Sequence, residues 1–374
     1  MIKKSFWLAF LILQTIAIKA GNFSVDPIRI SLLTYTPGTE LYSTFGHSAV
    51  RVVDYCNNTD YTYNYGTFDF DDEGFYFKFI KGNLKYKLSR IPTEYVILYT
   101  QEENRSIVEN EFFLPFGLKK EIQQALEQNY LPGNRQYYYD FLYNNCSTRI
   151  FDLIDSIAHP APAKPGKEFE SQTFLNLVDP YLSKHSWSKL AINVSAGSEF
   201  YKQSDFKSSV FLPDSLQSYL KELVLNDKQT PLVGPDTLLL KMEETHTREY
   251  SLAGIMLSVL FLIGLSIRYF EYRIEKRIIA FDYFVFVPVI LFSVVLWLVL
   301  LISDHEIFRW NFHLLWLNPV WTVFLLPKVK PGKRIRIVLG ALLLTAYILS
   351  LILYGFYFPL VLLLLILVTR IIKS

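Results

Sequence analysis

The sequence is poor in cysteine and in charged residues. Only two cysteines, Cys56 and Cys146, occur in 374 residues, which excludes a disulfide scaffold and a cysteine-rich metal site. Charged residues make up 19% of the chain, against about a quarter in typical soluble proteins. The 37 Lys and Arg nearly balance the 35 Asp and Glu, so nucleic-acid binding by bulk positive charge is excluded. With 51% hydrophobic residues, a disordered chain is also excluded and a purely soluble one is not expected.

The hydrophobic residues are concentrated in two parts of the chain. Two lysines precede an apolar run from Phe6 to Ile18, the pattern of a signal peptide over residues 1–20, with an uncleaved anchor as the alternative. Beyond Tyr250 the chain is mostly apolar, and a membrane-spanning helix needs about 20 such residues. Five spans are expected, at Tyr250–Ile267, Phe281–Ser303, Phe308–Leu326, Ile335–Leu353 and Phe356–Ile372.

The loops between these spans predict the orientation. The loop after the first span has four basic residues and the loop after the third has five, whereas residues 303–306 after the second read SDHE. Basic loops stay in the cytoplasm, so residues 21–248 are expected outside, as the signal peptide requires. We predict a signal peptide at 1–20, a first external domain at 21–165, a periplasmic appendix at 166–248 and a transmembrane domain at 249–374.

The external part reads as a mixture of strands and helices, which predicts an α+β fold. Alternating and β-branched residues predict a hairpin of His47–Asp54 with Tyr61–Phe70. Further strands are expected at Leu84–Leu88 and Tyr95–Tyr99, and helices at Leu118–Gln128 and Ser147–Ile157.

The most specific chemical feature is Cys146 at the start of a helix. Asn145 is a strong N-cap residue, and a cysteine in the first turn lies at the positive end of the helix dipole. That position lowers the pKa of a thiol and favours the nucleophilic thiolate. His47, at the start of a strand, is the expected base. The pair resembles the papain arrangement in a circularly permuted order, because the histidine precedes the cysteine.

A third group is expected to orient the imidazole. Asn64 on the neighbouring strand is preferred, because an amide oxygen accepts the second ring N–H, and Tyr65 is the alternative. Two other interpretations of Cys146 stay open: a small buried apolar residue, or a disulfide with Cys56 in the oxidising periplasm. No histidine pair has the spacing of zinc ligands, and neither metal nor cofactor is expected.

Several motifs, in order, resemble the Bacteroidota-type lipoprotein N-acyltransferases, whose periplasmic domain is similar to permuted papain-like enzymes of the lecithin–retinol acyltransferase type. The motifs lie at Ser31–Gly38, Glu40–Arg51, Tyr63–Phe70, Tyr76–Leu88, Tyr137–Asp152, Phe211–Leu216, Pro231–Val233 and Asn311–Pro319.

The resemblance implies a two-step acyl transfer in which Cys146 takes a fatty acyl chain from a phospholipid as a thioester, with His47 as base. The acceptor is then the N-terminal amine of a diacylglyceryl-cysteine lipoprotein. Asn145 and Ser147 are candidate supporting residues beside Cys146. His305 and Asn311, near the outer ends of the second and third spans, are candidates for binding a lipid headgroup or the acceptor, since polar groups near spans are often functional. An ordinary interfacial loop is the alternative.

Two other functions compete with this one. A membrane-tethered cysteine peptidase or amidase acting on cell-wall peptides uses the same dyad, although a single anchor suffices for it. A non-enzymatic assembly protein with a decayed site is the third possibility. Five Asn-X-Ser/Thr sequons, one of them at Asn145, would attract glycans in a eukaryotic secretory pathway. The expected location is therefore a bacterial inner membrane, with several spans and the catalytic domain in the periplasm.

Overall fold

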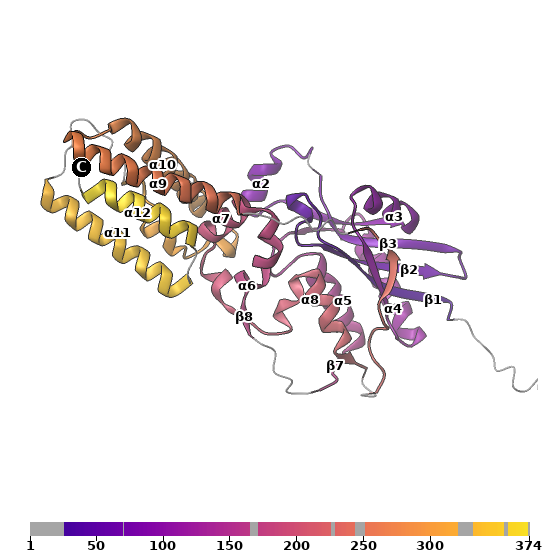
Figure 1. The fold of residues 1–374 in the computed structure, drawn as a ribbon. Helices are drawn as coiled ribbons and strands as arrows, with labels where there is room; N and C mark the ends of the chain where they lie inside the picture. Colours follow the sequence, from indigo (N-terminus) through magenta and orange to yellow (C-terminus); the bar gives the residue numbers. More distant parts are fainter. Residues whose placement is uncertain are drawn as a thin grey trace, which may run out of the picture.

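The computed structural model describes residues 26–69, 71–164, 171–225, 229–243, 251–320, 332–354 and 358–372. They form a mixed α+β domain built on a sheet, followed by a helical region at the opposite end of the molecule (Figure 1). The predicted signal peptide lies outside the described residues.

An antiparallel sheet of seven strands, in the order β11-β5-β1-β2-β3-β4-β6, organises the first domain. The strands are β1 (Ile28–Tyr35), β2 (His47–Asp54), β3 (Thr59–Thr67), β4 (Lys85–Pro92), β5 (Ile107–Glu111), β6 (Gln136–Tyr138) and β11 (Thr237–Leu240). The predicted β2–β3 hairpin is confirmed, with Val50 opposite Tyr63. Two short pairs, β7 (Ala161–Pro162) with β10 (Leu223–Val224) and β8 (Gln172–Thr173) with β9 (Gln203–Ser204), lie outside this sheet.

Side chains alternate between the two faces of the sheet along each strand, and both faces are covered by other elements. On one face, residues such as Ile30, Leu32 and Val50 are buried in the main core with helices α4, α5 and α8. On the other face, Leu33 and Ala49 form a smaller core with α3 and β11. The helices of this domain are α2 (Phe75–Lys81), α3 (Thr93–Glu102), α4 (Phe116–Tyr130), α5 (Cys146–Ala158), α6 (Phe174–Val178), α7 (Ser186–Ser195) and α8 (Pro213–Lys221).

The strand predicted at Tyr95–Tyr99 is wrong, because this segment lies inside α3. Its β-branched and aromatic residues favour a strand, but its burial follows a helical period. Val96 and Ile97 pack on the sheet, Thr93 and Thr100 are buried one turn away on either side, and the tyrosines face outward. Tertiary packing of this face outweighs the local preference.

The predicted appendix is continuous with the sheet domain. Strand β11 pairs with β5 at the edge of the sheet, and Leu216 and Leu220 of α8 are fully buried in the main core. Residues on either side of the proline-rich segment near residue 162 therefore share one core.

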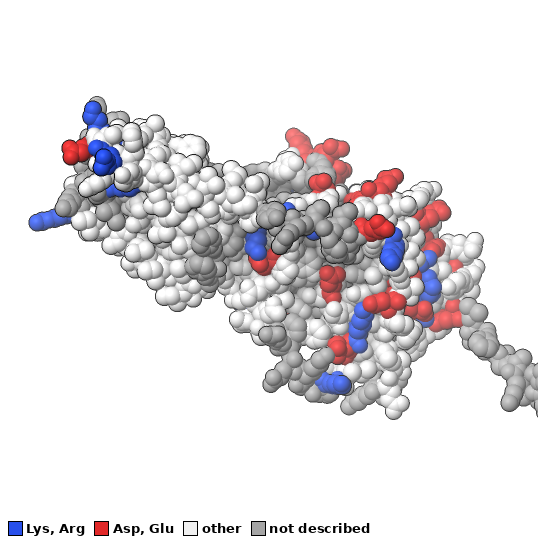
Figure 2. Space-filling model, in the orientation of Figure 1, with Lys and Arg blue, Asp and Glu red and all other residues white. Residues whose placement is uncertain are grey.

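The helical region contains α9 (Leu252–Ile274), α10 (Ile279–Ile302), α11 (Lys333–Tyr354) and α12 (Phe358–Ile372). By length and composition, α9 and α10 are able to cross a membrane, with mean hydropathies of 1.9 and 3.1. The apolar parts of α11 and α12 are shorter. Figure 2 shows that Lys, Arg, Asp and Glu gather at the far tip of this region and on the sheet domain, with an uncharged belt between them.

The third predicted span is not a helix in its described part. Residues 306–320 contain only short 3₁₀ stretches, at Glu306–Phe308, at Phe312–Leu315 and at residues 319–320. Asn311 caps the second turn by accepting from the His313 N–H, and Pro319 lacks the N–H that a helix interior requires. The segment is still buried by its apolar residues, since Trp316 lies in the core of the helical region.

A buried ion network joins three helices at the end away from the sheet domain. The Arg370 guanidinium on α12 binds Glu271 on α9 at 2.7 and 2.8 Å and Asp282 on α10 at 2.6 Å. Its side chain is only 2% exposed, so these charges depend on one another. This end also carries the basic loop between α9 and α10, as the predicted orientation requires.

Candidate active site

The site is built around the first turn of α5, where Asn145 acts as the N-cap. Its Oδ1 accepts hydrogen bonds from the N–H groups of Ser147 and Thr148 at 2.9 and 3.0 Å. Its Nδ2 donates to the carbonyls of Phe141 and Phe211 at 2.7 and 2.9 Å. The amide is thus fully used in holding the start of α5 in place.

His47 lies at the start of β2, next to Asn64 of β3. The His47 Nε2 is 2.8 Å from the Asn64 Oδ1, and the same oxygen accepts from the Gly66 N–H at 2.7 Å. An atom that accepts from a backbone N–H is an acceptor, so His47 Nε2 carries the proton in this pair. The second ring nitrogen, Nδ1, is then free to accept the proton of a thiol.

Cys146 is a half-buried residue whose thiol interacts with His47. Burial raises the pKa of this thiol, but the positive charge of His47 and hydrogen bonds from His47 and the Ser48 backbone lower it to about 7 from its ordinary 9.0. Thiolate is therefore abundant at neutral pH, as nucleophilic attack requires.

Two residues near the site escaped the sequence analysis. A Cβ at Gly66 would lie 2.5 Å from the His47 Cε1, so glycine leaves space for the imidazole there. Ser48 places its hydroxyl 3.0 Å from that of Ser147, which joins β2 to the start of α5. The position of Gly66 is predictable from the sequence, because the β2–β3 register, continued from Val50 opposite Tyr63, places Gly66 opposite His47.

Aromatic side chains surround the thiol. Tyr86, Tyr137 and Tyr139 belong to the core on which Cys146 packs. Burial raises the pKa of Tyr86 and of Tyr137 well above the ordinary value, and the nearby Cys146 raises it further. The phenols therefore stay neutral beside the thiolate.

Other predicted residues lie away from the thiol or act as supports. Tyr65 is buried in the core, where its hydroxyl accepts from Asn129 Nδ2 at 2.9 Å, so it does not orient His47. Ser147 is buried, with its hydroxyl 3.9 Å from the Cys146 Sγ. The disulfide alternative is wrong, because Cys56 is free and exposed on the turn after β2.

His305 and Asn311 lie where the two domains meet. The His305 Nε2 donates to the Phe79 carbonyl on α2 at 2.9 Å. The Asn311 Nδ2 donates to the Val194 carbonyl on α7 at 2.8 Å. In this structure both residues hold the helical region against the sheet domain, and neither belongs to the group around Cys146.

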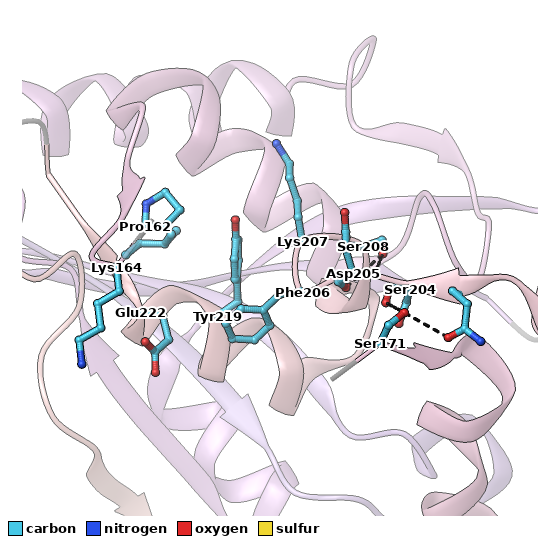
Figure 3. A pocket seen from close by; sticks show the side chains of 12 residues that line it. Pro162, Lys164, Ser171, Ser204, Asp205, Phe206, Lys207, Ser208, Tyr219 and Glu222 are labelled. Carbon is cyan, nitrogen blue, oxygen red and sulfur yellow. Dashed lines mark hydrogen bonds between the residues drawn. The ribbon is translucent and has the colours of Figure 1, made fainter. Parts of the chain in front are cut away.

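A cavity of about 510 Å³ lies apart from this site. Figure 3 shows Lys164 and Glu222 at one end, Ser171 and Ser204 at the other and the Tyr219 ring between them. Cys146, His47 and Asn64 are not among the residues that line it.

Comparison with known families identifies both parts of the chain. Residues 17–179 match the Lnb N-terminal periplasmic domain, and residues 254–374 match the Lnb transmembrane domain. No curated protein and no solved structure matches the chain. The two matches follow the order of the sheet domain and the helical region and confirm the resemblance drawn from the motifs. The chain belongs to the Lnb family and is a membrane protein with an extracytoplasmic domain.

Proposed function

We propose that this protein is an acyltransferase that moves a fatty acyl chain from a phospholipid, through a thioester on Cys146, to the N-terminal amine of a diacylglyceryl-cysteine lipoprotein. The observation that carries the proposal is the grouping of the Cys146 thiol with His47, whose Nε2 is hydrogen-bonded to Asn64, in a domain attached to membrane helices. A nucleophile, a base and an orienting group are what acyl transfer through a covalent intermediate needs.

In the first half-reaction, His47 Nδ1 takes the thiol proton and the thiolate attacks the carbonyl carbon of the phospholipid ester. The C–O bond to glycerol then breaks. The leaving alkoxide receives the proton from the His47 imidazolium and departs as a lysophospholipid. Asn64 keeps the ring in position by accepting the Nε2–H throughout.

The tetrahedral intermediate carries a negative oxygen that needs a hydrogen-bond donor. The cap of α5 already uses the N–H groups of Ser147 and Thr148, so we assign the oxyanion to the backbone N–H of Cys146. The positive end of the α5 dipole favours the same charge.

In the second half-reaction, the amine of the lipoprotein attacks the thioester carbonyl. His47 takes the amine proton, the C–S bond breaks and the Cys146 thiolate is restored. A thioester stays reactive toward an amine, so no metal or cofactor is required by the balance of the reaction.

The position of the site relative to the membrane supports lipid substrates. Phe45, two residues before His47, packs on Phe141 of the loop before Cys146, with ring centroids 5.0 Å apart. Both belong to a cluster that includes Ile307, from the loop after α10. The segments that carry the base and the nucleophile thus adjoin the end of the membrane-spanning region.

The remaining features of the proposal concern fold and location. A helix headed by the cysteine, packed on an antiparallel sheet that supplies histidine and asparagine from adjacent strands, supports a permuted papain-like domain. We place the protein in the bacterial inner membrane with several spans, and the sheet domain in the periplasm.

Intact-protein mass spectrometry tests the chemistry. Detergent-purified protein and a Cys146→Ala variant are incubated with phospholipid, and the mass of one acyl chain that hydroxylamine removes is expected on the wild type alone. Addition of a diacylglyceryl-cysteine peptide should discharge that adduct and acylate the peptide. Absence of an adduct together with cleavage of peptide substrates would instead establish a cysteine peptidase or amidase.

A further inference from the structure

Helix α2 presents an unusually apolar surface. Of its seven residues only Phe75 is buried, while Tyr76, Phe77 and Phe79 are 74%, 58% and 44% exposed. Ile80 is also exposed. Soluble surfaces rarely expose adjacent large apolar side chains in this way, and such patches mark contact sites.

The position of α2 indicates what covers this surface. The carbonyls of Phe79 and Lys81 accept from His305 Nε2 and the Asp304 N–H at 2.9 and 2.8 Å. Asp304 lies two residues after the end of α10, and the last residues of that helix, Leu301 and Ile302, are exposed apolar residues. The apolar face of α2 therefore continues the membrane-facing surface of α10.

We propose that α2 lies in the outer-leaflet interface of the membrane, with its exposed aromatic face in contact with lipid, and that phospholipid reaches Cys146 along α2. Aromatic rings favour this interface, and short amphipathic segments bind there by burying their apolar face. The exposed acidic residues before the helix, Asp71, Asp72 and Glu73, keep its start at the level of the headgroups.

A row of aromatic rings connects α2 with the thiol. Phe79 stacks on Phe75 with ring centroids 6.4 Å apart, Phe75 is 5.8 Å from Phe68, and Phe68 is 5.0 Å from Tyr86. Tyr86 belongs to the core on which Cys146 packs. This part of the inference rests on the proposed function, because an acyl chain from the bilayer would pass along these rings to the nucleophile, and Phe75 and Tyr86, which are buried, would have to move aside for it.

Fluorescence quenching tests the membrane contact without any acyl chemistry. In a Cys56→Ser, Cys146→Ala background, Phe77→Cys is labelled with an environment-sensitive fluorophore, and the full chain is placed in nanodiscs that contain doxyl-labelled phospholipid. Tyr55→Cys, 52% exposed on the turn after β2, is the matched control. Strong quenching at position 77 and little at position 55 is expected. Equal quenching at both positions overturns the membrane contact.

The path to Cys146 is tested by Phe77→Glu beside Phe77→Leu. The charge should raise the phospholipid concentration needed for half-maximal thioester formation about fivefold, while Leu leaves it unchanged. Iodoacetamide alkylation of Cys146 should be the same in both variants, because position 77 does not touch the thiol. Unchanged thioester formation in Phe77→Glu overturns the path, whereas a wild type that forms no thioester refutes the proposed function and leaves the quenching result standing.

Discussion

Replacing His47 by alanine should raise the pKa of the Cys146 thiol by about two units. The positive charge and the hydrogen bond of His47 hold this pKa at about 7, against burial, which raises it. Without them the thiol returns at least to its ordinary 9.0. At pH 7 the thiolate fraction then falls about 50-fold. A more basic thiolate is the stronger nucleophile, so the rate constant of the thiolate itself should rise about eightfold when its pKa rises by two units. The net rate of alkylation at pH 7 should therefore fall about sixfold.

The assay is the pH dependence of iodoacetamide alkylation, followed by intact mass in a Cys56→Ser background that leaves a single thiol. Because the pKa is lowered, the wild-type rate should stay near its maximum above pH 8 and fall tenfold per unit below pH 6. The His47→Ala profile should have the same shape, with its midpoint displaced to higher pH. His185→Ala, at the start of α7, is the matched histidine control and should keep the wild-type midpoint. A midpoint that stays near pH 7 in His47→Ala would show that another group activates the thiol, and would refute the proposed pairing.

Three further variants test the neighbours of His47 and the ion network of the helical region. Asn64→Ala should lower the rate of thioester formation about 10- to 100-fold, because the imidazole loses its orienting acceptor. The rate is measured by mass spectrometry in rapid-quench samples, and a wild-type rate contradicts the role given to this amide. Gly66→Ala should also reduce the rate of thioester formation, because the new Cβ displaces the His47 ring, and should change the thermal unfolding temperature by no more than a few degrees. Full activity would mean that the ring has room to move. Arg370→Met should destabilise the membrane region by about 3 kcal/mol in detergent unfolding, since Glu271 and Asp282 lose the buried guanidinium between them and keep only Arg268 at 3.5 Å and Arg277 at 2.6 Å. A smaller loss in a variant that also neutralises both carboxylates is the control, and equal losses contradict the network.

Local signals in the sequence suffice to predict which residues lie together at the centre of the candidate site. Asn145 and the helical period after it predict the start of α5, and the turn after Asp54 predicts the hairpin that brings Asn64 next to His47. Both features depend on residues close together in the chain. The geometry of these three side chains therefore follows from one cap and one strand register.

Other parts of the fold depend on distant residues and were misread. The residues of α3 have the composition of a strand, and only their packing on Leu33 and Ala49 selects the helix. The segment around Trp316 is as apolar as a span, yet the hydrogen bonds of Asn311 hold it in short turns. His305 is a candidate for binding a lipid headgroup or the acceptor because it is polar and near a span, and an ordinary interfacial loop is the alternative. Its bond to the Phe79 carbonyl shows that the same chemistry also serves to join two domains.

The place of β11 at the edge of the sheet has a consequence for biosynthesis. Strand β5 is in position early in the chain, but its outer edge is covered by residues 237–240, which immediately precede the segment leading to α9. An uncovered strand edge is a template for pairing with other chains. The sheet is complete only after nearly the whole extracytoplasmic part has been synthesised, when the first membrane helix follows within a dozen residues. Closure of the fold and insertion of the protein into the membrane are thus adjacent events in time, and a chain cut before β11 exposes β5 to aggregation.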